Sequence, residues 1–161
     1  MIFITVGSQK FQFNRLLEKV DKLIAEGVIT EPVFAQSGAS DYHPRNYSYE
    51  PFLSRDDFSK RIDECDIVIT HGGTGVIIGA VKKGKKVIAV PRLAKYGEHV
   101  DDHQLQLLGQ FDDLGIIVAC YDLDELGEKF NTLKTIQLKP YHSNTDAIVG
   151  SIEEYIETIK Q

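Results

Sequence analysis

The sequence predicts an α/β domain: a doubly wound, Rossmann-like parallel sheet with helices on both faces. Short apolar runs rich in Val and Ile alternate along the chain with segments of helical periodicity. The runs are apolar throughout, as is typical of parallel strands that are covered on both faces. The length of 161 residues suits one domain, and we expect residues 1–161 to share one fold.

Six segments are predicted to be strands or extended chain. Gly7 follows the first of them and Pro91 the fifth, and both residues are frequent where strands stop. The segments are residues 2–6, 32–36, 47–53, 66–70, 86–90 and 116–120.

The helices have recognisable starts and ends. Ser54 is predicted to cap a helix that runs through Glu64, with acidic residues in its first turn, where the helix dipole favours them. Gly27, Gly84 and Gly115 stop three others. Those three are predicted over residues 13–24, 74–83 and 100–114. Two more are predicted over residues 122–130 and about 144–160, the last with an apolar stripe opposite a glutamate-rich face.

Composition excludes some classes of function. The formal net charge of -6 argues against a nucleic-acid-binding surface, which is normally basic. No apolar run approaches the length of a membrane span, and the start lacks the pattern of a signal peptide, so we expect a cytoplasmic protein. Cys65 and Cys120 are isolated, and we interpret both as reduced packing residues.

The most informative stretch is "ITHGGTGVIIG", residues 69–79, where a predicted strand meets a predicted helix. Glycine lets a ligand approach the backbone closely, and the first amides of a helix attract anions. Gly73, Thr74 and Gly75 are therefore candidates to hold a diphosphate. A tight turn with glycines for packing is the alternative interpretation.

Two other nucleotide motifs fit this stretch less well. It is not a P-loop, because no Gly-Lys-Ser/Thr follows. Gly73, Gly75 and Gly79 approach the dinucleotide fingerprint, but they follow the fourth predicted strand, and the next strand ends in Pro91 and Arg92 without an acidic residue. A nicotinamide-dependent oxidoreductase remains an alternative.

A second polar cluster, "EHVDDHQ" at residues 98–104, opens a predicted helix after a strand-end loop. Such side chains can bind the hydroxyl groups of a sugar, and we favour that reading over capping by Asp101 and Asp102. His99 and His103 lie four residues apart, but no third metal ligand is evident, so no metal is predicted. The segment from Gly7 to Lys10 would face the same ligand.

Together these motifs resemble the glycosyltransferase family 28 C-terminal domain, which is the donor-binding half of GT-B enzymes. The features that carry the likeness are "HGGTG" after a buried strand, a strand that ends in proline, and "DDHQ" at the start of a helix. "IFITVGSQKFQFNRLL" and "EHVDDHQ" resemble in particular the single-domain catalytic subunits of bacterial capsule and exopolysaccharide synthesis. The resemblance covers residues 1 to about 120 well.

The resemblance implies roles for individual residues. Ser8 and its neighbours would face the donor phosphates, Phe52 and Leu53 would line a uracil pocket, and Gln36 with Gly38 matches a Q-x-G pattern. Gly79 stands where two-domain relatives carry an acidic ribose reader, and Glu98 is the substitute considered. The candidate catalytic residues are Asp102 and His103; the candidate substrate-binding residues are Gly7, Ser8, Gln36, Phe52, Leu53, His71, Gly73, Thr74, Gly75, Glu98 and Gln104.

The resemblance also implies a partner. A GT-B active site lies between two domains, so a membrane-anchored, acceptor-binding glycosyltransferase subunit would supply the second half and recruit this chain to the inner face of the plasma membrane. The expected reaction is transfer of a sugar, with β-1,4-galactosyl transfer as one possibility, from a UDP-sugar substrate to a lipid-linked saccharide, without cofactor or metal. A non-catalytic nucleotide-sugar-binding subunit is the alternative.

Overall fold

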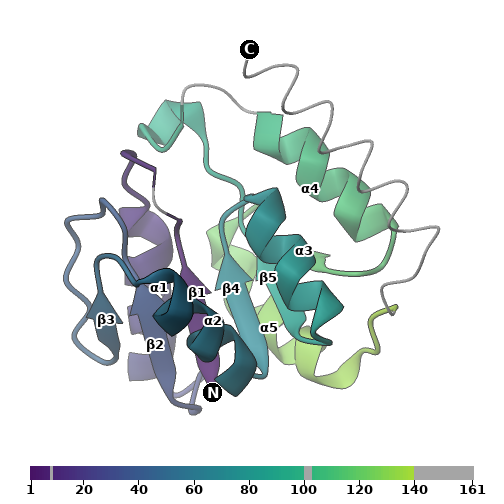
Figure 1. Ribbon diagram of the computed structural model, residues 1–161, viewed down its shortest axis with the longest axis horizontal. Coiled ribbons are helices and arrows are strands. Elements are labelled where there is room, and N and C mark those ends of the chain that lie inside the picture. Colours follow the sequence, from purple (N-terminus) through teal and green to yellow (C-terminus); the bar gives the residue numbers. More distant parts are fainter. Residues whose placement is uncertain (8, 100–102, 140–161) are drawn as a thin grey trace.

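The computed structural model of the chain describes residues 1–7, 9–99 and 103–139. The strands form one sheet in the order β3-β2-β1-β4-β5-β6, and every neighbouring pair is parallel (Figure 1). The predicted doubly wound α/β fold is confirmed. The strands are β1 (Ile2–Thr5), β2 (Val33–Gln36), β3 (Ser48–Glu50), β4 (Ile67–Thr70), β5 (Lys86–Ala89) and β6 (Val118–Ala119).

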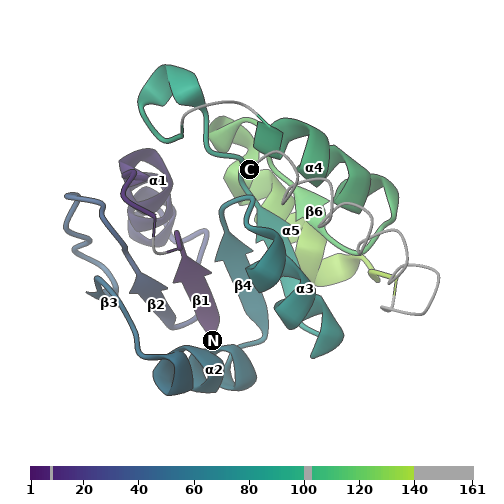
Figure 2. The same cartoon turned by 45° about the horizontal axis from the view of Figure 1, so that its top comes forward.

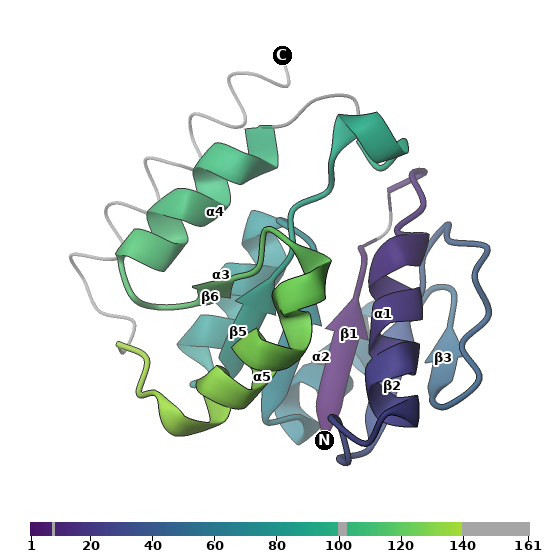
Figure 3. The same ribbon diagram turned by 180° about the vertical axis from the view of Figure 1, so that it is seen from behind.

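Helices cover both faces of the sheet, and each face has its own apolar core (Figures 1 and 3). One face carries α1 (Asn14–Ala25) and α5 (Leu126–Thr135). The other carries α2 (Arg55–Glu64), α3 (Thr74–Lys82) and α4 (His103–Asp113). Two 3-10 turns, η1 (Ala94–Tyr96) and η2 (Leu123–Glu125), complete the described elements.

Alternate residues of β1 enter the two cores. Ile2 and Ile4 join the core under α1 and α5, whereas Phe3 joins the core under α2 and α3. Phe3 is fully buried, with its ring 6.5 Å from that of Phe34 and 5.3 Å from that of Phe58 between centroids. Burial of one such ring contributes about 1.5–3 kcal/mol.

Two predicted boundaries are wrong. β6 is only two residues long, because its pairing with β5 begins at Val118. The preceding isoleucines are buried but do not pair with β5. The helix predicted over 122–130 is instead the turn η2, capped by Asp122, followed by α5, which continues to Thr135 because Leu133 extends its buried stripe. The helix predicted over 144–160 lies outside the described residues.

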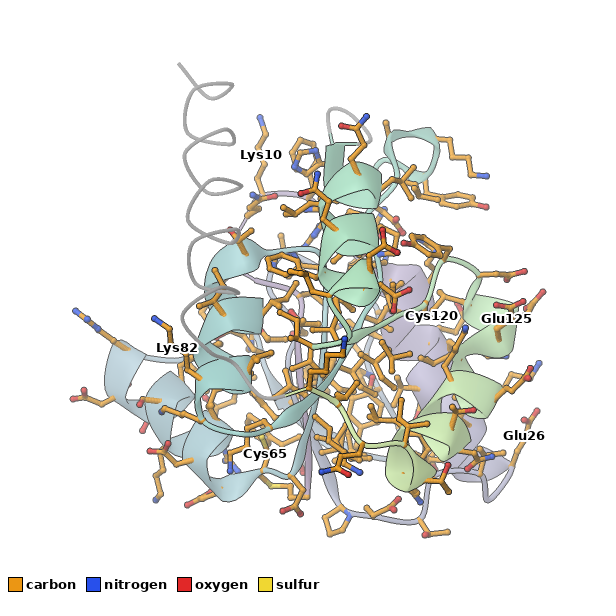
Figure 4. The ribbon with its side chains drawn as sticks, turned by 90° about the vertical axis from the view of Figure 1, so that its right-hand side faces the viewer. Lys10, Glu26, Cys65, Lys82, Cys120 and Glu125 are labelled. Carbon is orange, nitrogen blue, oxygen red and sulfur yellow. The ribbon has the colours of Figure 1, made fainter. Side chains whose placement is uncertain are left out.

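The parallel register brings the carboxyl ends of the strands to one edge of the sheet (Figure 2). Thr5 of β1 lies between Gln36 of β2 and Thr70 of β4 in the last rung, and all three are buried. Lys10, in the connection after β1, stands at this end of the molecule, far from Cys65 at the other end (Figure 4). Ligands of doubly wound folds bind at this carboxyl edge.

The two cysteines behave as the sequence predicts. Cys65 and Cys120 are free and buried, and burial raises the pKa of both thiols. Within the described part of the chain, no helix combines the length and apolar character that crossing a bilayer requires.

A buried carboxylate holds the connection between β2 and β3 against α1. Asp21 is 4% exposed and accepts hydrogen bonds from the backbone N–H groups of Arg45 and Asn46, both at 2.9 Å, and from the Tyr42 hydroxyl at 2.7 Å. Burial raises the pKa of Asp21, but these hydrogen bonds together outweigh it and leave the pKa below its ordinary value.

We expect Asp21→Asn to lower the free energy of unfolding by about 1–3 kcal/mol at neutral pH, because the new amide NH2 faces N–H donors. Because the folded pKa of Asp21 is lowered, its contribution is present above about pH 4 and is lost as the pH falls through the folded pKa. Urea unfolding between about pH 3 and pH 7 measures the difference, which should shrink at the acidic end. A difference that does not change with pH would contradict this assignment.

Candidate functional site

The start of α3 presents backbone donors for which the described part of the chain provides no acceptor. Gly73 is the N-cap and makes no side-chain capping hydrogen bond, and the first turn contains no acidic residue. The first helical hydrogen bond runs from the N–H of Ile77 to the carbonyl of Gly73, so the N–H groups of residues 74–76 have no helical acceptor. Gly75 is exposed, and a Cβ added to it would meet nothing within 4 Å.

At two other helices that begin at the same edge, a nearby side chain accepts a hydrogen bond from an N–H group of the first turn. The Ser54 hydroxyl accepts from the N–H of Asp57 at the start of α2. At the start of α1, the side chain of Gln12 accepts from the N–H of Asn14 at 2.8 Å. Among the described residues, side chains accept from the first N–H groups of α1 and α2 but not from those of α3, which makes the start of α3 the candidate anion site of the three.

The glycines before α3 make room for His71. A Cβ on Gly73 would lie 2.5 Å from Cε1 of the His71 ring, and a Cβ on Gly7 would lie 2.6 Å from Nε2. Gly7 also has a φ of 79°, which favours glycine. The ring of His71 is thus enclosed by the chain after β1 and the chain before α3. The packing interpretation of these glycines holds for Gly73, whereas Gly75 stays open.

His71 is neutral at physiological pH. It is 6% exposed, and its pKa is lowered to about 3, first by burial and then by electrostatic interaction with Arg92 and His99. Its Nδ1 has no hydrogen-bond partner among the described residues. His71 therefore contributes shape to the site and no charge.

Arg92 is a functional candidate that the sequence analysis missed. It follows β5 and Pro91 at the carboxyl edge and is fully buried. Burial lowers its pKa to about 10, against the opposing effect of Glu98, so the guanidinium remains charged at neutral pH. Only its position after a strand could have signalled a role, because nothing in the local pattern distinguishes a buried arginine from an exposed one.

Two residues of the second polar cluster serve the fold. Glu98 is 1% exposed, and its carboxylate accepts from Arg15 at 2.7 and 3.1 Å and from the N–H of Leu93 at 2.9 Å. This geometry gives Glu98 a structural role and does not favour it as the ribose reader. Gln104 accepts from the N–H of Arg92 at 2.9 Å through Oε1 and fills the space beside Gly72.

Gln36 joins three loops of the edge. Its Nε2 donates to Thr5 Oγ1 at 3.3 Å and to the carbonyl of Gly7 at 3.4 Å, and its Oε1 accepts from the N–H of Leu53 at 3.1 Å. Phe52, next to Leu53, is 55% exposed. The N–H of Gly7 donates to Thr5 Oγ1 at 3.2 Å and is therefore engaged within the fold.

The structure thus links the loops that carry the predicted site, through contacts among Gly7, Gln36, Leu53, His71, Gly73 and Gln104. Thr74 and Gly75 follow directly at the start of α3. Ser8, Asp102 and the side chain of His103 lie outside what the structure describes, so their roles stay predictions.

A separate hollow of about 470 Å³ lies at the amino ends of β5 and β6. Four lysines line it, and three of them are bonded within the fold: Lys85 to the carbonyl of Asp63, Lys86 to that of Leu133, and Lys134 to the Glu31 carboxylate. We therefore do not assign this hollow to the site. No group of three or more His, Cys, Asp or Glu suited to a metal occurs among the residues described.

The parallel sheet and the open helix start are typical of doubly wound α/β domains, which bind their ligands at the carboxyl edge of the sheet. The chain belongs to the family of the glycosyltransferase family 28 C-terminal domain, whose model matches residues 1–159.

Curated relatives include two proteins named UDP-N-acetylglucosamine transferase subunit ALG13. The protein from Candida glabrata is 33% identical over 96 residues, which are 59% of this chain and 43% of that protein. The human protein is 25% identical over 138 residues, which are 74% of this chain and 11% of that protein. The chain thus spans less than half the length of either relative.

Solved structures share the fold. Acinetobacter baumannii MurG superposes with a TM-score of 0.57 at 21% identity, covering 94% of this chain and 49% of that one. The glycotransferase of kitacinnamycin superposes with a TM-score of 0.60 at 16% identity, covering 84% and 35%. At these identities the likeness supports the architecture alone.

We expect Gly73→Ala to destabilise the protein by about 1–3 kcal/mol, because its Cβ would collide with the enclosed ring of His71. In the background of His71→Ala the same change should cost clearly less, because the ring is gone. A double-mutant cycle in urea measures this coupling. Gly75→Ala, where the Cβ meets open space, is the matched control and should not destabilise.

Additive effects of Gly73→Ala and His71→Ala would contradict the packing of the ring against Gly73. Equal tolerance of alanine at positions 73 and 75 would contradict it as well.

Proposed function

We propose that this chain is the donor-binding, catalytic subunit of a glycosyltransferase that uses a UDP-sugar. The observation that carries the proposal is the open start of α3, with no side-chain cap and no acidic residue in its first turn, in a chain of a glycosyltransferase family. An anion with several oxygens suits such a start. The relatives named above are UDP-N-acetylglucosamine transferase subunits, which favours a UDP-sugar as the source of that anion.

In the proposed complex, the diphosphate lies against the N–H groups of Thr74, Gly75 and Val76. The positive end of the α3 dipole adds to their attraction. Departure of UDP leaves negative charge on the diphosphate, and fixed donors stabilise that charge without having to reorganise. We propose that these donors act without a metal ion.

The uridine would lie over the tips of the neighbouring strands. Leu53 and the exposed ring of Phe52 are our candidates for contact with the base, because Gln36 holds that loop beside Gly7. Near the donor sugar we propose Gln104, together with Asp102 and His103 as catalytic residues, on the strength of the family motif.

A partner is the second part of the proposal. The relatives are named as subunits of a UDP-N-acetylglucosamine transferase. We propose that a membrane-anchored subunit supplies the acceptor-binding half and brings this chain to the cytoplasmic face of the plasma membrane. The acceptor would be a polyprenyl-linked saccharide of capsule or exopolysaccharide synthesis, and galactose is our candidate for the sugar.

The geometry does not favour the nicotinamide alternative. The glycine pattern follows β4, whereas the dinucleotide fingerprint follows the first strand of its fold. Arg92 stands after β5, with no acidic residue at the end of that strand. The other alternative, a non-catalytic subunit that binds a nucleotide sugar, predicts that transfer by the two chains together survives disruption of the α3 start.

We expect Gly75→Asp to weaken the binding of UDP at least tenfold, because the carboxylate would occupy the helix start and repel the diphosphate. Stability should be unchanged or raised by about 0.3–1 kcal/mol, because an acidic residue in a first turn favours the helix. Isothermal titration calorimetry with UDP and thermal unfolding of the same samples measure the two effects. Transfer by the two-chain system should fall in parallel.

Gly79→Asp is the matched control, because it makes the same change one turn further along α3, where a Cβ also meets nothing within 4 Å. Its affinity for UDP should stay within about twofold of the wild type or improve. Normal UDP binding by Gly75→Asp would overturn the proposed site. Normal transfer despite lost UDP binding would favour the non-catalytic subunit.

A further inference from the structure

Arg92 carries a buried positive charge, and the proposed function as described above gives this charge no role. It is fully buried, and in the described part of the chain each acceptor of its side chain is a backbone carbonyl. The nearby carboxylate of Glu98 is occupied by Arg15 and by the N–H of Leu93. A buried charge without a direct counter-ion is costly, so its presence calls for a reason.

The guanidinium holds both ends of the β1–α1 connection, residues 6–13, of which the structure describes all but residue 8. It donates to the carbonyl of Val6 at the start of this connection and to that of Phe11, at 2.9 Å, near its end. Between these two anchors lie Gln9 and Lys10, which are exposed at the carboxyl edge.

The same side chain ties this connection to the loop after β5. Nη1 of Arg92 also donates to the carbonyl of Glu98 at 3.1 Å, and Gln12 donates to the carbonyl of Tyr96 at 2.9 Å. Figures 1 and 2 show the chain after β1 rising toward η1 at this edge. The backbone N–H of Arg92 is itself held by Gln104 at the start of α4. One residue thus joins β1, β5 and α4 around the edge.

Arg92 is connected to the proposed diphosphate site through Gln104, which accepts from the backbone N–H of Arg92 at 2.9 Å and fills the space beside Gly72. Arg92 acts electrostatically on His71, which directly precedes the glycines of α3. Because His71 is neutral and Glu98 is paired with Arg15, the Arg92 guanidinium is left to attract an anion at this edge. Because the guanidinium is buried and bonded to carbonyl oxygens of the loops, it does not contact the ligand directly. It acts by holding the loops in place and by electrostatic attraction over a distance.

We propose that Arg92 is a positioning residue for the donor: it fixes the β1–α1 connection at the sheet edge and attracts the diphosphate without touching it. This inference rests on the proposed function. The proposed role has two parts: the hydrogen bonds of the guanidinium hold the connection, and its positive charge attracts the anion.

Two variants test these contributions by isothermal titration with UDP. Arg92→Lys keeps the charge but cannot reach both ends of the connection, and we expect its dissociation constant to rise about threefold. Arg92→Gln also loses the charge, and the constant should rise about tenfold or more. Loss of affinity between about 50 mM and about 300 mM NaCl should be smaller in Arg92→Gln than in Arg92→Lys and in the wild type.

Asp21→Asn is the stability control, because Asp21 holds a different connection, between β2 and β3. It should lower the melting temperature and leave the dissociation constant for UDP within about twofold of the wild type. A merely structural role of Arg92 would produce the same pattern as this control, with no partial rescue by lysine and no change in salt dependence.

Hydrogen exchange on the wild-type protein needs no variant and covers the case in which both substitutions prevent folding. UDP should slow exchange of the amides of residues 9–12, because the connection is part of the donor site. If UDP binds and these amides are unaffected, or if both variants bind UDP as the wild type does, the role of Arg92 is refuted. If the wild type binds no UDP, the proposed function itself fails.

Discussion

The enclosure of one neutral imidazole ring organises the carboxyl edge of this sheet. His71 fills the space that side chains at positions 7 and 73 would need, so the chain after β1 and the chain before α3 are packed together through it. Gly75, in the first turn of α3, is exposed, and no side chain among the described residues caps this helix start. The glycine-rich motif therefore has two functions: Gly73 serves the fold, and Gly75 leaves access to the helix start.

We attribute the attraction of an anion to this edge to the backbone at the start of α3 and to one buried residue, Arg92, more than to surface lysines. The chain has a net charge of -6, yet the first turn of α3 has no acidic residue, and the guanidinium of Arg92 lies behind the neighbouring loops. A helix start and a buried cation attract a diphosphate without making the surface basic. Such a protein can bind a nucleotide diphosphate and still have little affinity for nucleic acid.

The fold could be predicted from the sequence because its signals are local. The Val- and Ile-rich runs, the cap at Ser54 and the glycines after helices set the elements to within a few residues. β6 was overestimated because burial and strand pairing look alike in an apolar run, and Ile116 and Ile117 are buried without pairing. The helix start at Thr74 was also predictable, because a strand, glycines and an apolar helix follow one another directly.

The contacts among loops could not be predicted in this way. Glu98 is polar and sits in a family motif, but its partner Arg15 is 83 positions away, and only the folded chain brings them together. The acceptors of Arg92 lie 80 to 86 positions away on the β1–α1 connection, apart from Glu98. Periodicity and capping signals report on neighbours along the chain and carry no information about such pairs. They therefore indicated a candidate site, but not the buried residues that pack behind it.

The proposed function depends most on a diphosphate bound at the start of α3. The most direct measurement is a titration of the ¹⁵N-labelled protein with UDP, followed residue by residue in the amide spectrum. The account predicts that the amide signals of Thr74, Gly75 and Val76 shift most and move downfield, as N–H groups that gain a charged acceptor do. Shifts that leave these three amides unchanged while UDP binds elsewhere on the chain would contradict it.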